Sequence, residues 1–319
     1  MSFAAQTKKE VTLIQEDECC RRTELSAIVS QNGILTEIDE RPALQVETEN
    51  VATARRIYTE LKDLMNVRPE VSVRKKMRLK KNNVYAVRVS ANQMDAVFKG
   101  LGWTLPSTLG PLALQVPAPS PVVLAKKKCC KRAYLRGMFL AAGSVNDPGS
   151  SSYHLELSFM EPNHAQYVRE LMNKTYGLHA KLIQRKKGYV VYLKEGEKIV
   201  EFLSVIGAHQ ALLKFEDVRI IKGMRNQVNR LVNCETANLN KTILAAVRQV
   251  EVIHLIHDRM GLDKLPPHLR EVAELRLEFP EVNLQELCQR LGGKVSKSGL
   301  NHRFRKLEEI ADNLRAGLR

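Results

Sequence analysis

The stretch that decides the fold is CCKRAYLRGMFLAAGSV, residues 129–145, because a second copy of it lies earlier in the chain. That copy, CCRRTELSAIVSQNGIL, occupies residues 19–35, so the two are offset by 129 − 19 = 110 residues. We expect Gly33 and Gly143 to end two helices in the left-handed conformation, as glycine commonly does. The identical aligned pairs are Cys19/Cys129, Cys20/Cys130, Arg22/Arg132, Leu25/Leu135 and Gly33/Gly143.

The segments that follow each copy also occur in one order: an alternating strand, a second helix and a basic hairpin. A long-period internal repeat indicates one supersecondary unit used twice. The sequence therefore predicts an α+β fold built from a pseudo-symmetric, duplicated αββαββ unit. The matching segments are residues 43–47, 52–65, 74–76 and 84–89 in the first unit, and 154–159, 165–176, 185–187 and 189–193 in the second.

Small residues on the second copy suggest why the two units would meet. Gly137 and Ala141 are four residues apart, so they share one helical face. Without large side chains there, two helix backbones can approach closely. Ala27 and Gln31 form a weaker version of this face in the first copy. The alternative is a pair of ordinary core helices that do not touch each other.

The charge of the chain points to a polyanionic partner. The 319 residues are 44% hydrophobic and carry a formal net charge of +15, which favours nucleic acid over a membrane surface. Residues 1–10 contain no apolar segment of signal-peptide length, and apolar runs such as residues 252–256 are too short to span a bilayer. We therefore expect a cytoplasmic protein. Six cysteines in that reducing compartment do not predict a disulfide framework.

The two adjacent cysteine pairs, at 19–20 and 129–130, raise the question of a four-sulfur metal site. Neighbouring residues on a helix point about 100° apart, and neither pair has the Cys-x-x-Cys spacing of zinc sites. Free cysteine behaves as a small hydrophobe. The spacing therefore favours packing in the core, and no metal or cofactor is predicted.

The basic hairpins are candidate DNA contacts, because strands of this composition can lay cations along a phosphate backbone. A solvated, merely charged hairpin is the alternative. The residues in question are Arg74, Lys75 and Lys76 in the first unit and Arg185, Lys186 and Lys187 in the second.

Composition divides the chain into five segments. A proline-rich linker separates the repeats, because prolines this dense interrupt helices and ladders. After the second repeat, apolar residues recur at helical spacing and predict two connecting helices, one from residue 218 and one over residues 240–259. The expected segments are residues 1–104 and 129–217 for the repeats, 105–128 for the linker, 218–265 for the connecting helices and 266–319 for a C-terminal domain.

The C-terminal domain reads as a helix-turn-helix. Asn283 and Ser296 are good N-cap residues for two helices, and Gly292-Gly293 separates them. An apolar stripe on the last helix predicts its buried side: Leu300, Phe304, Leu307, Ala311 and Leu314. The opposite side holds Ser298, Asn301, His302 and Arg305, flanked by Lys297, Arg303 and Lys306.

Such a helix can enter the major groove. Asparagine and arginine can pair with base edges, whereas the flanking cations suit phosphates, which position without specifying sequence. The alternative is an amphipathic surface helix with no ligand.

Residues 135–143 resemble the LAGLIDADG motif of homing endonucleases. The resemblance implies that two such helices pack at a pseudo-two-fold axis, with an acidic eighth residue on each to hold catalytic metal ions. Here the eighth positions are Asn32 and Ala142. Alanine offers no ligand and asparagine only a neutral one, while hard divalent cations need charged oxygens. We therefore expect a scaffold without strand cleavage and without catalytic residues.

The repeats followed by a helix-turn-helix resemble the WhiA family along nearly the whole chain. The most specific blocks are Arg225-Asn226, Asn229-Arg230, residues 233–238 (NCETAN), Lys297-Ser298-Gly299 and Asn301-His302-Arg303. The resemblance implies a nucleoid-associated, sequence-specific regulator of transcription that binds double-stranded DNA and acts in cell division, chromosome segregation and sporulation. Other regulatory or cell-division proteins are implied as further partners. The alternatives are a structural DNA binder without gene control and a residual homing-type endonuclease.

Overall fold

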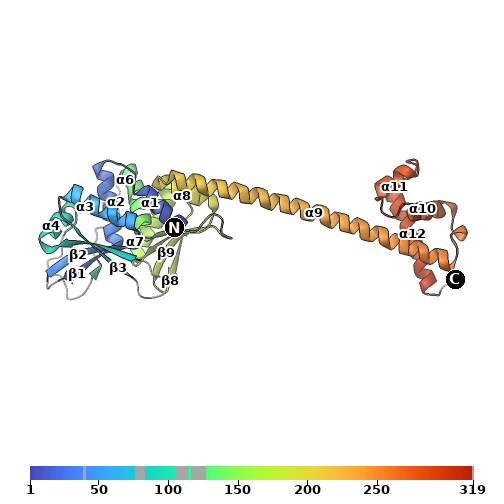
Figure 1. Cartoon of the computed structure of the whole chain (residues 1–319), viewed down its shortest axis with the longest axis horizontal. Helices are drawn as coiled ribbons and strands as arrows, with labels where there is room; N and C mark the ends of the chain where they lie inside the picture. Colours follow the sequence, from blue (N-terminus) through green and yellow to red (C-terminus); the bar gives the residue numbers. More distant parts are fainter. Residues whose placement is uncertain (39–40, 76–82, 105–113, 116–126, 318–319) are drawn as a thin grey trace. The chain divides into compact units, whose positions relative to one another are not determined.

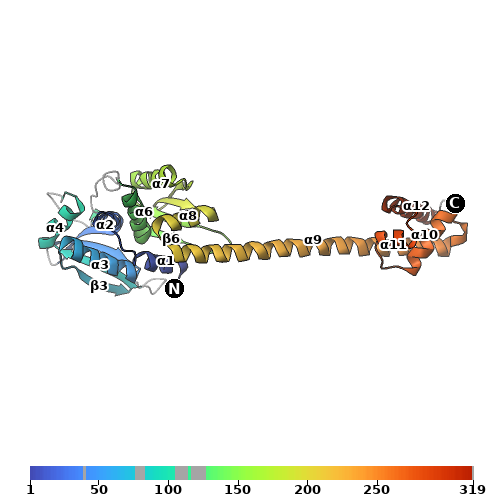
Figure 2. The ribbon, with the colours of Figure 1, turned by 90° about the horizontal axis from the view of Figure 1, so that it is seen from above.

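The computed structural model describes residues 1–38, 41–75, 83–104, 114–115 and 127–317. The chain forms two compact units, Met1–Gly223 and Met224–Arg319, drawn from two directions in Figures 1 and 2. Among the helices of the described residues, none combines the length and the apolar character that crossing a bilayer requires.

The first unit contains the duplicated topology, which confirms the predicted α+β class. A short helix, α1 (Phe3–Val11), precedes the repeats. The first repeat is α2 (Glu18–Asn32), β1 (Gly33–Ile38), β2 (Arg41–Thr48), α3 (Val51–Met65), β3 (Glu70–Lys75), β4 (Asn83–Ser90) and α4 (Ala91–Leu101). The second is α6 (Lys128–Ala142), β6 (Gly143–Val145), β7 (Leu155–Phe159), α7 (Pro162–Tyr176), β8 (Lys181–Arg185), β9 (Gly188–Leu193) and α8 (Gly196–Ile206).

The two antiparallel sheets have matching strand orders. The first is β3-β4-β2-β1-β5 and the second is β8-β9-β7-β6, so β3 and β8 occupy equivalent edges. Strand β5 (Leu114–Gln115) lies in the segment predicted as a linker and pairs with β1, while most of that segment lies outside the described residues. Core side chains meet across the strands, for example where Leu35 pairs with Leu44 and Leu157 with Val191.

Helices α2 and α6 lie side by side in the middle of the first unit, where the two repeats meet (Figure 1). A Cβ atom built on Gly137 would be 2.5 Å from the carbonyl oxygen of Glu24 and 2.7 Å from Cβ of Ala27. The backbones therefore approach as closely as a glycine allows. This confirms the predicted role of Gly137.

The prediction that Gly33 and Gly143 adopt the left-handed conformation is wrong. Their φ angles are −79° and −80°, in the extended region, and each residue begins the strand that follows its helix. A Cβ atom on Gly143 would be 2.3 Å from Cδ2 and 2.6 Å from the carbonyl oxygen of Phe139. Glycine is needed at 143 for close approach to the preceding turn, and positive φ plays no part.

A buried ion network joins the repeats at the same interface. Arg136 of α6 and Glu24 of α2 are each 1% exposed. The Arg136 guanidinium donates to the carboxylates of Glu24 and Glu16. Arg56 of α3 lies 3.0 Å from Glu24 and 3.1 Å from Glu60, extending the network into the first repeat. Because Arg136, Glu24, Arg56 and Glu60 are buried, while only Glu16 is partly exposed, the repeats depend on one another for neutralisation.

The predicted pair of connecting helices is a single helix, α9 (His209–Arg259), which runs through the stretch around residue 240. Residues 233–242 contain neither proline nor glycine, so nothing there interrupts the helical hydrogen bonds. Its first apolar stripe is exposed, with Met224 at 63% and Leu231 at 60%. Farther along, Ala246, Val252, Ile253 and Ile256 are buried, but Val247, which was also placed on the second stripe, is 49% exposed.

The second unit builds a small core from the end of α9, a 3₁₀ turn (η1, Leu262–Lys264) and three helices: α10 (Pro267–Glu278), α11 (Leu284–Arg290) and α12 (Lys297–Arg315). Both predicted caps are confirmed. The Asn283 side chain accepts from the backbone N–H groups of residues 285 and 286, and the Ser296 hydroxyl accepts from residue 299. Gly292 and Gly293, between α11 and α12, have φ angles of 68° and 70°.

Candidate nucleic-acid interface

Helix α12 has a buried side and an exposed side, as the sequence predicts. Leu300 and Leu307 are fully buried and Phe304 is 4% exposed, so this side anchors the helix on α10 and α11. On the other side, an amide, an imidazole, a hydroxyl and three cations face solvent together. The exposed residues are Lys297, Ser298, Asn301, His302, Arg305 and Lys306.

Arg303 differs from the other predicted contacts. Its side chain is only 23% exposed and lies 3.9 Å from the carboxylate of Glu271. Nη1 also donates to the carbonyl oxygen of His268, at 3.3 Å. The guanidinium is therefore held against α10 and contributes less free charge to the exposed side than Arg305 does.

Arg276 fixes the turn between α10 and α11, a role that the sequence analysis missed. The residue is 1% exposed, and its Nη1 donates to the carbonyl oxygen of Val282 at 2.7 Å. The guanidinium carbon also lies 5.5 Å from the ring centroid of Phe304, within the range of a cation–π contact. Burial lowers the pKa of Arg276. The sequence did contain a signal for this role: Arg276 follows Ala273 by three residues and so lies on the apolar face of α10, which indicates a buried arginine. Arg276 therefore joins the turn between α10 and α11 to α12.

The basic residues of the first unit gather at equivalent sheet edges. Arg74 and Lys75 end β3, and Lys76 lies outside the described residues. Arg185 ends β8, and Lys186 and Lys187 form the two-residue turn that leads into β9. The structure thus places both basic stretches at corresponding positions of the two repeats.

The arginines at these edges are already paired, whereas the lysines are not. Arg74 forms an ion pair with Glu47 of β2, and Arg185 lies 3.2 Å from Glu156 of β7. Within the described parts of the chain, Lys75, Lys186 and Lys187 make no ion pair. The lysines therefore carry the charge that remains free to attract an anion.

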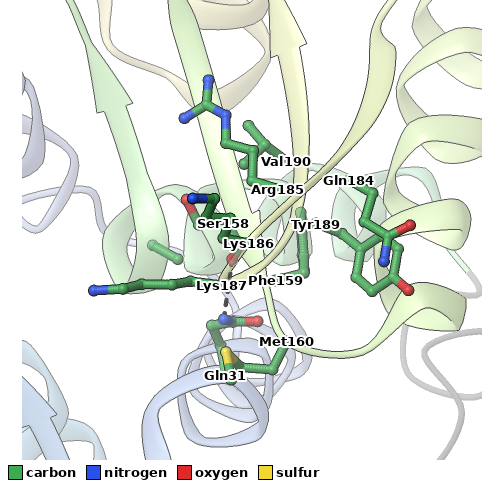
Figure 3. Close-up of a pocket in the computed structure, with 12 residues that line it drawn as sticks. Gln31, Ser158, Phe159, Met160, Gln184, Arg185, Lys186, Lys187, Tyr189 and Val190 are labelled. Carbon is green, nitrogen blue, oxygen red and sulfur yellow. Dashed lines mark hydrogen bonds between the residues drawn. The ribbon is translucent and has the colours of Figure 1, made fainter.

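A cavity of about 810 Å³ lies beneath the second basic turn (Figure 3). Its wall includes Gln31 of the first repeat and Lys186 and Lys187 of the second. Nε2 of Gln31 donates to the carbonyl oxygen of Ser158 at 3.0 Å, which links the two repeats across the cavity. In Figure 3 the Lys187 and Arg185 side chains extend in different directions from the turn.

The two positions at which the motif would carry acids show how the site has changed. Nδ2 of Asn32 donates to the carbonyl oxygen of Glu47 at 2.9 Å and to that of Ala141 at 3.2 Å. Asn32 therefore acts as a hydrogen-bond donor where a metal ligand would have to be an acceptor. Ala142 contributes no polar side chain. Both residues line a second cavity, of about 580 Å³.

Lys8 lines the same cavity and places a cation near these positions. Burial lowers its pKa to about 8, an effect that the carboxylate of Glu49 partly opposes. A basic amine beside an amide donor disfavours a divalent cation at this point. Among the described residues, three or more cysteine, histidine or acidic side chains lie close enough together to bind one metal ion at a single place. That place is the group of four cysteines at the N-terminal ends of α2 and α6.

We expect Asn32→Asp to destabilise the first unit by about 1–3 kcal/mol, because a carboxylate cannot donate to the two carbonyl oxygens that the amide now satisfies. Urea unfolding would measure this change. Asn32→Ala removes the donors without adding charge and is the control, with a smaller loss. If Asn32→Asp were as stable as the parent, the two hydrogen bonds of the amide would contribute little to stability. If Mn²⁺ restored the stability of Asn32→Asp, a carboxylate at this position could still bind a metal ion.

Comparison with known proteins identifies all three parts. The WhiA N-terminal LAGLIDADG-like domain matches residues 18–102, the WhiA LAGLIDADG-like domain matches residues 131–225, and the WhiA C-terminal HTH domain matches residues 228–311. The full-length DUF199/WhiA from Thermatoga maritima has a similar fold, with a TM-score of 0.56 and 24% identity over 98% of this chain and 99% of that one.

Two of the relatives are similar along nearly their entire length. The probable cell division protein WhiA of Anoxybacillus flavithermus is 55% identical over 99% of this chain and 96% of its own. That of Bacillus subtilis is 54% identical over 99% and 98%. With three domain matches in tandem and this identity throughout, the chain belongs to the WhiA family.

Proposed function

We propose that this protein is a non-catalytic, sequence-specific DNA-binding regulator of transcription. Its helix-turn-helix domain and the names of its relatives support a DNA-binding role related to cell division. The observation that carries the finer proposal is the exposed side of α12. Asn301 and Arg305 are exposed there, on the side of the helix opposite its buried stripe. Free amide and guanidinium groups on such a helix are suited to reading base edges.

The two units divide the work in this proposal. Asn301, Arg305, Ser298 and His302 read bases, while Lys297 and Lys306 contact the flanking phosphates. Arg303 mainly supports α12, since it is held by α10. The basic edges of the repeats add affinity without sequence preference, chiefly through the unpaired lysines, because cation–phosphate contacts read charge alone.

Strand cleavage has no place in the proposal. Asn32 and Ala142 supply no carboxylate, and the Asn32 amide is committed to two backbone carbonyls. The repeats would thus bind DNA without cleaving it, or provide a surface that binds regulatory or cell-division proteins. We further propose that the protein acts in chromosome segregation and sporulation. We also propose that it is cytoplasmic and associated with the nucleoid. A structural DNA binder without gene control is the second candidate.

Genome-wide occupancy of the full chain, measured together with transcripts after its depletion, tests the proposal. We expect discrete sites that share a motif and adjoin genes whose transcripts change, and we expect Asn301→Ala/Arg305→Ala to lose those sites. Discrete sites without transcript changes would favour the structural binder. Uniform coverage that is unaffected by the double variant would contradict sequence-specific reading.

A further inference from the structure

The two cysteine pairs meet in the structure, although the sequence placed them 110 residues apart. Cys19 and Cys20 lie in the first turn of α2, and Cys129 and Cys130 lie in the first turn of α6. All four Sγ atoms lie within 4.8 Å of one another. The close packing of α2 against α6 at Gly137 brings these helix ends together.

The spacing of the sulfur atoms suits one tetrahedral metal ion. A zinc–sulfur bond of about 2.3 Å places the sulfurs of a four-cysteine site about 3.8 Å apart. The Sγ atoms of Cys19 and Cys20 are 3.9 Å apart and those of Cys129 and Cys130 are 4.0 Å apart. Disulfide sulfurs would lie about 2.05 Å apart, and all four thiols are free here. A cluster of two irons would need the pairs farther apart than one ion does.

The helix ends around the quartet stabilise negative charge. Neither N-cap residue, Asp17 nor Lys127, makes a side-chain capping bond, so first-turn N–H groups such as that of Cys19 remain open to sulfur, whereas the Cys20 N–H already donates to the carbonyl oxygen of Asp17. Lys128 and Lys131 add positive charge and make no ion pair within the described residues. The open N–H groups and the lysines favour thiolates, the form that binds metal, while the carboxylates of Asp17 and Glu18 at the start of α2 oppose them.

The thiols also differ in exposure in a way that fits a closed structural site. Cys20 and Cys130 are buried, Cys19 is half-buried, and Cys129 reaches the surface. The exposed thiol gives an ion a route of entry, and the ion then displaces the protons of the buried pair.

We propose that Cys19, Cys20, Cys129 and Cys130 together bind one zinc ion and so join the N-terminal ends of the two central helices. Each pair alone lacks the usual spacing, but the two helices supply two sulfurs each from opposite sides. With four protein ligands and no open position, the site is structural. Its function is to hold the two repeats in register, independently of DNA binding by α12.

The test begins with the full chain, purified under reducing conditions without added metal or chelator. Elemental analysis is expected to find one zinc per chain, and cobalt substitution is expected to give the absorption of a tetrahedral tetrathiolate centre. Cys129→Ser alters an exposed side chain, so the variant should fold. It is expected to lose most of the zinc and to melt several degrees lower, as the parent does after chelation.

Cys234→Ser and Cys288→Ser, which lie outside the quartet, are the matched controls and should retain the zinc. The proposal is overturned by a zinc-free parent that also fails to take up cobalt. It is equally overturned if Cys129→Ser retains zinc at the parent's stoichiometry, or if added zinc leaves six freely reactive thiols. The proposal is also overturned if the metal-free chain contains a Cys20–Cys129 disulfide and takes up no metal after reduction. That result would show that these cysteines form a reversible disulfide and not a zinc site.

Discussion

Arg136→Met is expected to lower the free energy of unfolding of the first unit by about 3–5 kcal/mol, the usual cost of removing one partner from a buried ion pair. The variant leaves Glu24, which is 1% exposed, with Arg56 as its remaining cation and frees the Glu16 carboxylate. Methionine fills a similar volume, so the decrease in the free energy of unfolding reflects the lost charge more than lost packing. Urea denaturation followed by circular dichroism measures it.

A surface pair provides the control for this experiment. Lys174 is 77% exposed and lies 2.8 Å from Glu170 on the same helix, so Lys174→Met should cost under about 1 kcal/mol. Adding Glu24→Gln to Arg136→Met should recover part of the stability, because the buried Glu24 charge, which keeps only Arg56 as a partner in the single variant, is removed as well. If Arg136→Met cost no more than Lys174→Met, the repeats would not depend on this network.

The double variant Asn301→Ala/Arg305→Ala is expected to reduce the ratio of specific to random DNA affinity on the order of 100-fold, because each base contact discriminates by about 1–3 kcal/mol. Both side chains are exposed and make no hydrogen bond or ion pair within the described residues, so the helix itself should remain intact. Fluorescence anisotropy with an operator duplex and a scrambled duplex measures the two affinities. Equal losses on both duplexes would show that these residues touch only the backbone.

Lys186→Ala/Lys187→Ala is the complementary variant for the same assay. It should weaken binding to both duplexes alike and flatten the dependence of log affinity on log salt by roughly one unit per lost phosphate contact. Arg185→Ala is the matched control at the same turn. Because Arg185 is paired with Glu156 at 3.2 Å, its removal should change the slope less. A larger change for Arg185 would mean that the pair opens on DNA.

Local rules account for most of what the sequence predicted correctly. The duplication followed from the 110-residue offset, and the caps at Asn283 and Ser296 followed from side chains that bond the nearest free N–H groups. The buried stripe of α12 followed from helical periodicity, and the close approach at Gly137 from its missing side chain. Apart from the duplication, which a comparison of the chain with itself reveals, each of these depends on residues within a turn or two of one another.

The errors arose where a residue's conformation depends on what surrounds it. Gly143 has the right type for a left-handed cap, yet the crowding by Phe139 and the start of β6 require an extended backbone. Two stretches of apolar residues at helical spacing predicted two connecting helices, but without a proline or glycine between residues 233 and 242 the helix α9 continues. The ion pairs of Arg74 with Glu47 and of Arg185 with Glu156 also depend on the surrounding sheet, and contact of these arginines with DNA stays a prediction.

By itself the sequence determined the duplicated topology, the loss of both acidic motif positions and the helix-turn-helix, because periodicity, residue identity and capping are local properties. Only the tertiary structure decided that Arg136 neutralises Glu24, that Asn32 bridges two backbone carbonyls, and that four cysteines converge. Those contacts join distant parts of the chain. They depend on how closely α2 and α6 pack, a geometry that no single stretch of residues specifies.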